Sequence, residues 1–507
     1  MSKYASLFAE PASIFGSRRE FLKRTGSGMG ILALAGLLRD QGLLQDQYLS
    51  AAEDSAGTSG LAVSNADDRS LHPMSPRPGH FPARAKSVIW LFLNGGPSHV
   101  DTWDYKPELT KRDGQELPGF DKNTGFFTDQ VGPLMKSPFK FERHGRSGAW
   151  VSDIFPHQAR HVDDMAFIHS CFTETNNHSP ALFEINTGMS RMGFPCVGAW
   201  VTYGLGSENR DLPGFVVMYD TLGRGLPKGH SQNWGAGFLP GVYQGTALAA
   251  QGPPIDNLAR PQGLTDGDQR NQLDLLAKLN RRELERSPGE AALAARIEAF
   301  ELAYRMQTTA PEALDVDRES KATKALYGLD DPKCTHFARQ CLIARRLVER
   351  GVRFIQIYSG GMENERSWDG HQDIVKNHGG FALETDRPIA GLLSDLKGRG
   401  LLDSTLIVCN GEFGRLPIVQ KGGTGRDHNP HAFTTWFAGG GVKGGTHYGQ
   451  TDDLGHKAVV DRVSVNDLHA TILRLIGIDH TRLTYRYNGR DYRLTDVAGN
   501  VVAPILT

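Results

Sequence analysis

Cysteine is scarce in this sequence, and its spacing argues against two classes of stabilised structure. The five cysteines are an odd number, and no two of them form a CxxC pair. A disulfide framework and a thiolate zinc site are therefore not indicated. Cys334 and Cys341 would lie two turns apart on one helix, about 10 Å at the standard rise, which is too far for a disulfide. We expect the cysteines to fill the core.

An excess of charge of either sign is also missing. Fifty-six basic residues stand against fifty-seven acidic residues, which leaves a formal net charge of −1. Nothing in this balance attracts nucleic acid or an anionic membrane surface. We therefore expect a small or neutral partner and no nucleic acid.

No apolar run is long enough to span a bilayer, which takes about 20 apolar residues. The short run Gly28–Leu38 follows Arg18–Arg19 and Phe21–Lys23. Paired arginines ahead of a weakly hydrophobic run are typical of a twin-arginine export signal, and the alternative is a basic amphipathic surface helix. We predict a signal over residues 1–40, a periplasmic or extracellular location, and no transmembrane segment after signal removal.

Residues 41–84 show no hydrophobic period and are rich in Ser, Ala, Asp, Gly and Pro, which predicts a flexible linker. Residues 85–507 instead alternate between strand-like and helix-like patterns. The predicted buried strands are short apolar runs: Ser87–Leu93, Met165–His169, Leu212–Met218, Val352–Tyr358 and Leu406–Cys409. This alternation predicts one α/β domain with a mostly parallel sheet covered by helices on both faces.

Three helical regions stand out between and after these strands. A charged, alanine-rich stretch at about 268–310 predicts a helical insertion, within which Ser287–Glu290 has the pattern of a capping box. One apolar helix face precedes the fourth strand, and it consists of Phe337, Cys341, Ala344 and Val348. Ser464 and Asp467 would cap a helix near the end of the chain.

Polar side chains gather where the predicted strands end. Asp369 and His371 follow the strand at 352–358, and Glu412 and His428 follow the strand at 406–409. We expect these two strands to be neighbours in the sheet. The carboxyl ends of parallel strands meet at one edge, where ligands bind in open α/β folds. A carboxylate with imidazoles suits zinc or manganese better than calcium. We predict that these four residues share a metal centre; the alternative is a solvated turn with an ordinary ion pair.

Five stretches of the chain resemble a known family. They are WLFLNGGPSHVDTWDYKPEL, NNHSPALFEINTG, SWDGH, CNGEFGRLP and GRDHNP. Together they are similar to the domain-of-unknown-function 1501 family, which comprises exported sulfatase-like proteins of the alkaline phosphatase superfamily, over about Ser87 to Thr495. The resemblance implies a three-layer αβα sandwich and a site with one or two divalent ions, zinc, manganese or calcium, for hydrolysing phosphate or sulfate esters.

The resemblance also implies which residues hold the metal. The candidate ligands are Asp369, His371, Glu412, His428 and Asp101. Glu412 stands where the superfamily has a ligand aspartate, and Phe413 replaces the histidine that follows it. Asn94 replaces the aspartate that normally ends the first strand, with Asp101 further along the chain.

The nucleophile has two possible interpretations. By the family's spacing, His178 stands at the nucleophile position of sulfatases, and Ala181–Leu182 replaces a Ser-Arg pair, which argues against a formylglycine. Ser179 is the hydroxyl beside it. Ser179 is either a nucleophile activated by metal coordination, with His178 beside it, or the cap of a short helix that begins at Pro180.

Arg415 completes the candidate catalytic residues. Its planar guanidinium either holds the non-bridging oxygens of an ester or pairs with Glu412 or Asp427. The sequence thus favours an exported metal-dependent hydrolase that acts on a phosphate or sulfate ester of a small molecule or glycan. The alternative is a catalytically silent metal-binding or scaffolding module at the cell envelope.

Overall fold

The computed structural model describes residues 73–249, 255, 258–286 and 291–507, which all fall within one compact unit. The predicted export signal, most of the predicted linker and the capping box at 287–290 lie outside the described residues. No helix in the described ranges is long and apolar enough to cross a membrane. The five cysteines are buried and unpaired.

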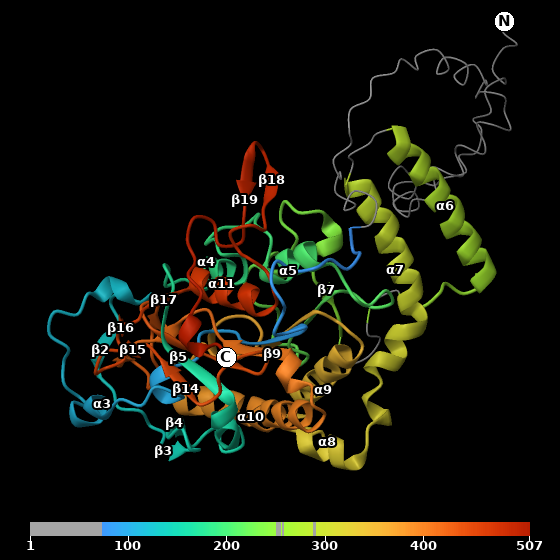
Figure 1. Cartoon of the computed structure of the whole chain (residues 1–507). Coiled ribbons are helices and arrows are strands. Elements are labelled where there is room, and N and C mark those ends of the chain that lie inside the picture. The colour runs from blue at the N-terminus through green and yellow to red at the C-terminus, as the bar shows by residue number, and fades with distance from the viewer. Residues whose placement is uncertain (1–72, 250–254, 256–257, 287–290) are drawn as a thin grey trace, which may run out of the picture. The chain divides into compact units, whose positions relative to one another are not determined.

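A nine-stranded sheet forms the centre of this unit (Figure 1). In spatial order its strands are β14 (Thr446–Tyr448), β5 (Met165–Phe172), β13 (Phe433–Ala438), β9 (Thr405–Asn410), β1 (Ser87–Leu93), β8 (Phe354–Ser359), β6 (Phe215–Met218) and β7 (Thr246–Ala247), with β17 (Val463–Ser464) paired to β5. Every pairing is parallel except those of β13, which runs antiparallel to β5 and to β9. The predicted mostly parallel sheet is confirmed.

The order of the central strands differs from the prediction. The strands that precede the predicted metal ligands, β8 and β9, are not neighbours, because β1 lies between them and pairs with both. All three strands run in the same direction, so their carboxyl ends still meet at one edge of the sheet.

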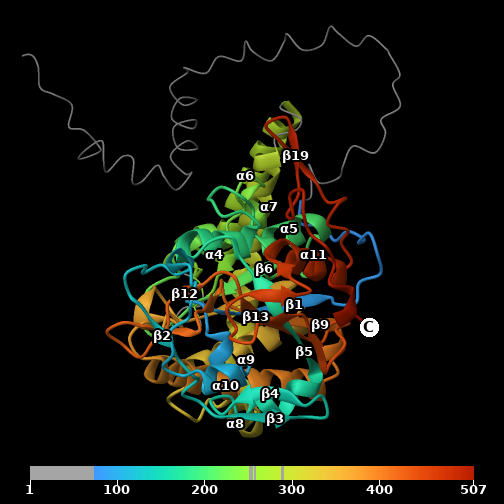
Figure 2. The ribbon, with the colours of Figure 1, turned by 90° about the vertical axis from the view of Figure 1, so that its left-hand side faces the viewer.

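Two hydrophobic cores, one on each face of the sheet, make the three layers. Ile89 and Leu91 of β1 belong to one core, and Trp90 and Phe92 belong to the other, as the alternation of a strand requires. The first core contains α9 (Thr335–Glu349) and α10 (Ile374–Gly398). The second contains α4 (His178–Thr187), α5 (Val197–Leu205) and α11 (Val465–Leu475). Figures 1 and 2 show these two sets of helices on opposite sides of the strands.

Two long helices span the region predicted as a helical insertion. They are α6 (Asp266–Arg286) and α7 (Ala291–Leu314). The last turns of α7 do not stand apart from the domain, because Met306, Ala310 and Ala313 are buried in the core that contains α9. The short helix α8 (Lys321–Tyr327) then leads into α9.

The remaining α-helix and strands are short and lie outside the main sheet. They are α3 (Pro107–Lys111) and the strand pairs β2 (Val131–Leu134) with β11 (Ile418–Gln420), β3 (Phe141–His144) with β4 (Ala149–Ser152), β10 (Gly414–Arg415) with β12 (His428–Asn429), β15 (Gln450–Thr451) with β16 (Ala458–Val460), and β18 (Tyr485–Tyr487) with β19 (Arg490–Tyr492). Ser464 and Asp467 form the predicted capping box of α11.

The end of the predicted linker packs against the domain. The backbone N–H groups of Arg77 and Phe81 donate to the carbonyls of Leu205 and Gly477, both at 3.0 Å. The guanidinium of Arg474 lies 3.9 Å above the ring of Phe81. The sequence suggested a linker as far as residue 84 because this stretch has no hydrophobic period. Its backbone pairs with carbonyls at the carboxyl ends of α5 and α11, and such contacts impose no period on the sequence.

Candidate metal centre

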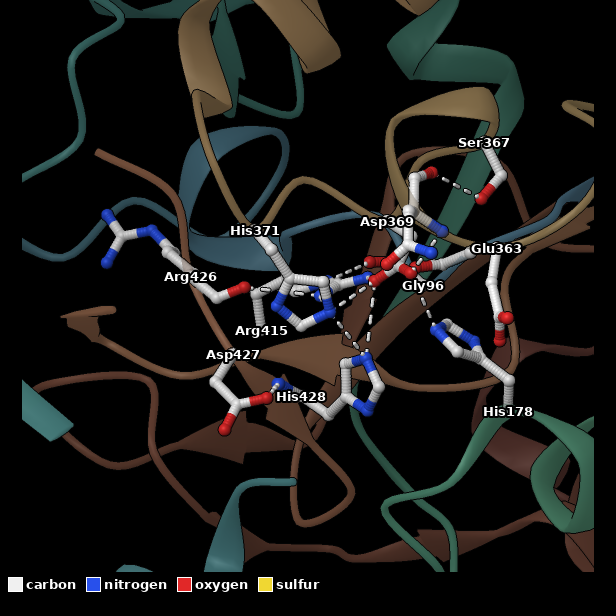
Figure 3. Close-up of polar contacts among 12 residues, drawn as sticks. Gly96, His178, Glu363, Ser367, Asp369, His371, Arg415, Arg426, Asp427 and His428 are labelled. Atoms are coloured by element: carbon white, nitrogen blue, oxygen red, sulfur yellow. Dashed lines mark hydrogen bonds and ion pairs between the residues drawn. The ribbon is translucent and has the colours of Figure 1, made fainter. Parts of the chain in front are cut away.

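A buried cluster of possible metal ligands lies at the carboxyl edge of the sheet (Figure 3). It consists of His178, Asp369, His371 and His428, each of which offers one ligand atom, and these four atoms all lie within 4.8 Å of one another. Each of these residues is at most 6% exposed. Asp369 Oδ1 lies 2.8 Å from His371 Nε2 and 3.2 Å from His428 Nε2.

Three different segments bring these four residues together. His178 is the first residue of α4, which follows β5, and Asp369 and His371 lie on the loop between β8 and α10. His428 lies on β12, whose antiparallel pairing with β10 sets it opposite Arg415. Each segment follows a strand of the main sheet, so the sheet sets the position of all four side chains.

Gly95 lets the first strand's loop approach this cluster. A Cβ at residue 95 would lie 2.6 Å from the backbone nitrogen of Asp369, and its φ of +108° is one that L side chains rarely adopt. The N–H of Gly95 donates to both carboxylate oxygens of Glu412, each at 3.1 Å. The glycine therefore places the loop of Asp369 and the carboxylate of Glu412 side by side.

The three histidines are all held by their Nδ1 atoms. His178 Nδ1 lies 2.7 Å from Glu412 Oε1, and His371 Nδ1 lies 2.7 Å from Gln420 Oε1. His428 Nδ1 lies 2.6 Å from the carbonyl oxygen of Asn176. An oxygen acceptor at Nδ1 favours the tautomer with its proton there, which leaves Nε2 as a lone-pair donor. Metal-bound histidines are held in this way in proteins.

The Nε2 atoms converge without enough protons to satisfy them. His371 Nε2 and His428 Nε2 lie 3.0 Å apart. His178 Nε2 lies 3.1 Å from Asp369 Oδ2 but forms no hydrogen bond with it or with any other described group. A buried nitrogen without a partner, such as His178 Nε2, is costly. Three imidazole Nε2 atoms and a carboxylate form a donor set that suits a divalent ion such as zinc. The residues present therefore fit a metal.

The charges of the cluster are strongly coupled. Although burial opposes it, Arg415 and then His178 hold the pKa of Asp369 well below its ordinary value. Burial alone would lower the pKa of His178, but Asp369 and Glu412 raise it to about 9. Burial and the neighbouring His178 lower the pKa of His428. A proton on His178 is thus favoured when no metal is bound, and a divalent ion would take the place of this proton.

Glu412, predicted as a ligand, lies behind His178 and outside the group of converging atoms. It is fully buried, and its oxygens accept from Gly95 and contact His178 Nδ1. In this position Glu412 orients the imidazole and raises its basicity.

Asp101, also predicted as a ligand, is not brought to the cluster. Its carboxylate accepts from Arg426 Nε at 2.6 Å and Nη2 at 3.1 Å, and from Ser98 Oγ at 2.5 Å. Both residues of this ion pair are fully buried. The guanidinium already neutralises the carboxylate, so Asp101 needs no metal to balance its charge.

Arg415 forms an ion pair with Asp369, which was not one of its predicted partners. It donates to Asp369 Oδ1 at 2.6 Å, to the carbonyl of Gly96 at 2.8 Å and to the carbonyl of Gly95, and forms no ion pair with Glu412 or Asp427. It is fully buried and does not line the pocket described below. Arg415 therefore fixes Asp369, and the described geometry does not place it against an ester.

Ser179 is neither the helix cap nor a wall of the pocket. The cap of α4 is Asn177, whose side chain accepts from the N–H of Ser179 at 3.2 Å. The helix begins before Ser179, so the predicted capping role is wrong. Asn177 and His178 line the pocket, whereas Ser179 does not.

A narrow pocket of about 60 Å³ opens onto the cluster. Its outer wall consists of Phe126, Phe127, Asn177, Lys228, Glu363 and Asn364. Lys228 forms an ion pair with Glu363. Sequence reasoning missed these wall residues, because they come from irregular stretches without any motif.

A second group of possible ligands already contains a cation. Asp220, His336 and Glu384 offer atoms within 4.8 Å of one another. Arg224 Nε donates to Asp220 at 3.0 Å, and Arg224 Nη2 donates to Glu384 at 2.7 Å. The guanidinium neutralises both acids, so this group has no need of a metal.

Comparisons with known proteins place the chain in a family and give its structural similarities. A sequence model described as "Protein of unknown function (DUF1501)" matches residues 85–506. No curated protein matches the chain by sequence.

Three solved structures illustrate the structural similarity. The phosphonate monoester hydrolase SpPMH from Silicibacter pomeroyi is 12% identical with a TM-score of 0.35, covering 83% of this chain and 76% of that one. The sulfatase PsFucS1 from Pseudoalteromonas sp. is 12% identical with a TM-score of 0.33, covering 78% and 68%. A protein in the alkaline phosphatase superfamily from Vibrio parahaemolyticus is 9% identical with a TM-score of 0.34, covering 82% and 71%.

Proposed function

The chain belongs to the DUF1501 family, and we propose that it is an exported, metal-dependent hydrolase of phosphate or sulfate esters. The observation that carries this proposal is the convergence of three imidazole Nε2 atoms and one carboxylate beneath an open pocket. His178, Asp369, His371 and His428 would hold the ion. A divalent ion in such a site supplies a Lewis acid that polarises an ester oxygen and lowers the pKa of bound water.

The residues around the ion would bind and orient the ester. Lys228 is the one lysine or arginine among the described residues that line the pocket, and a negatively charged ester oxygen can replace its partner Glu363. Phe126 and Phe127 cover the cluster from the outside and exclude bulk water. Exclusion of water strengthens each charge interaction inside the pocket.

Water is the nucleophile that this pocket supports. No Ser, Thr, Cys or Tyr is among the residues that line it in the described part of the chain. A covalent ester intermediate on Ser179 is therefore not part of the proposal. We expect Ser179→Ala to retain activity.

The test combines metal content with hydrolysis by purified protein. Elemental analysis should find one divalent ion per chain, and aryl phosphates and sulfates should be hydrolysed with zinc or manganese. His371→Ala should weaken metal binding and abolish hydrolysis, whereas Ser179→Ala should leave both intact. If the metal is present and no aryl ester is hydrolysed with any of zinc, manganese, magnesium or calcium, the hydrolase proposal fails.

A metal-binding module without catalysis is the second candidate. Two features of the pocket over the cluster favour this candidate. The described lining residues include no hydroxyl or thiol, and the pocket volume of about 60 Å³ leaves little room for a substrate. Retained metal with no hydrolysis, and loss of stability on metal removal, would favour this module.

A further inference from the structure

A second cavity lies at the carboxyl end of β5, away from the metal centre. Its volume is about 470 Å³, and it shares no lining residue with the pocket over the metal ligands. Its walls include Phe172, Arg462, Asp467, His480, Arg493 and Val497. The volume falls in the range of about 300–1,000 Å³ that is usual for sites of small organic ligands.

The acidic residues in and beside this cavity already have partners. Asp467, the one acid in its wall, accepts from Ser464 N at 2.8 Å and Oγ at 2.7 Å and from Asn500 N at 2.6 Å, because it caps α11. Next to the cavity, Asp479 accepts from Thr481, and Asp496 pairs with Arg490. Asp467 and Asp479 keep their negative charge, because their donors are uncharged, but neither forms an ion pair with an arginine of the cavity wall.

The two arginines of the cavity wall have no acidic partner. Neither Arg462 nor Arg493 forms an ion pair with a carboxylate in the part of the chain that the structure describes. The guanidinium of Arg462 lies 4.2 Å above the ring of Phe172, and Arg493 Nε donates to the carbonyl of Asp496. A stacked guanidinium keeps its N–H edges open, and these edges match the oxygens of a sulfate, phosphate or carboxylate.

We infer that this cavity binds a small organic oxyanion: a sulfate, phosphate or carboxylate group carried by a body about the size of a sugar. Arg462 and Arg493 would hold the charged group. His480, whose Nδ1 lies 2.9 Å from Thr495 Oγ1, adds a polar atom, and Val497 offers an apolar wall that is 83% exposed. The inference does not depend on activity at the metal centre.

The test is a calorimetric titration of the full chain with glucose 6-phosphate, glucose 6-sulfate and glucuronate. At least one should bind saturably, and the ranking of the three identifies the charged group. The double variant Arg462→Gln and Arg493→Gln should weaken this binding by at least tenfold, and each single variant should weaken it less. The matched control is Arg474→Gln, since Arg474 also stacks on a phenylalanine, Phe81, but lies at the other end of α11 outside the cavity.

Two results would overturn the inference. One is the absence of saturable binding by all three ligands up to about 10 mM, a concentration that would still reveal affinities of about 3 kcal/mol. The other is equal affinity in the wild type and in a folded double variant, which would assign the binding to the metal centre or to another surface. Each single variant provides the same comparison if the double variant does not fold.

Discussion

Replacement of His428 by alanine and of Glu412 by glutamine should separate the metal ligands from the residues that orient them. His428 contributes one of the four converging atoms. Glu412 lies behind His178, with its Oε1 2.7 Å from Nδ1 of that histidine. The first substitution removes a ligand, whereas the second leaves every ligand in place and alters only the support of one imidazole.

The expected losses follow from these positions. About 10–16 kcal/mol of zinc binding shared among four ligands gives about 3 kcal/mol each, so His428→Ala should weaken zinc binding roughly 10²–10³-fold. Removal of a carboxylate that supports a metal-bound histidine typically weakens binding by about 10–100-fold, or about 1.4–2.7 kcal/mol. In Glu412→Gln the amide oxygen can still accept from His178, but its NH₂ group then faces the N–H of Gly95, so we expect the upper half of this range.

Competition with a chromophoric chelator measures both zinc affinities at neutral pH. Glu384→Gln is the matched control, because Glu384 also contacts a histidine, His336 at 3.1 Å, but belongs to the group that Arg224 neutralises. Wild-type affinity in both His428→Ala and Glu412→Gln would refute a metal centre at this cluster. A loss in Glu412→Gln as large as that in His428→Ala would refute the supporting position of Glu412 and make it a direct ligand.

Three further predictions concern other parts of the chain. Asp101→Asn should destabilise the fold by about 3 kcal/mol in urea titrations, because it leaves Arg426 buried without its counter-charge, and should leave zinc affinity unchanged; a loss of zinc would restore Asp101 as a ligand. Burial lowers the pKa of His469 to about 4, so this histidine stays neutral in the folded protein. In the unfolded chain the same histidine takes up a proton below about pH 6.5, and the stability of the fold therefore falls as the pH falls. His469→Gln, which can still donate to the carbonyl of Ile185, should therefore lose about 2 kcal/mol less stability than the wild type between pH 7 and pH 5, and equal losses would contradict this. Lysine at both Arg18 and Arg19 should retain the precursor in the cytoplasm, as fractionation and immunoblotting would show, and unchanged export would exclude the twin-arginine route.

Apolar runs made most of the fold predictable. Each of the five predicted strands overlaps a strand of the main sheet, because a buried parallel strand has to be apolar on both faces. The strand Phe433–Ala438 was missed although its aromatic and β-branched residues are typical of a strand. Its antiparallel direction is set by the return of the chain through β10 and β12, a path that sequence periodicity does not encode.

The site was less predictable than the sheet. Strand-end reasoning indicated Asp369, His371 and His428, because polar residues after parallel strands meet at one edge. His178 was placed by its resemblance to a nucleophile position, yet the structure sets it among the possible ligands. It reaches them from β5, which is separated from β9 by β13, and the order of strands cannot be derived from local patterns. Lys228 carries no motif and reaches the pocket only through the tertiary fold.

The two acid and histidine groups of this chain differ in how their charge is balanced. Arg224 sits between Asp220 and Glu384 and donates to both, so that group is complete without a metal. Arg415 also approaches a carboxylate, but it donates to Asp369 only at Oδ1. Oδ2 accepts only the backbone N–H of Asn364 and faces an imidazole nitrogen that has no hydrogen bond. Burial of His178 Nε2 without a hydrogen bond costs free energy, and Arg415, which donates to Asp369 at Oδ1, does not offset this cost. A divalent ion bound among the Nε2 atoms would offset it. The convergence of three imidazole Nε2 atoms on Asp369, with His178 Nε2 lacking a hydrogen bond, therefore distinguishes this cluster as the candidate metal centre.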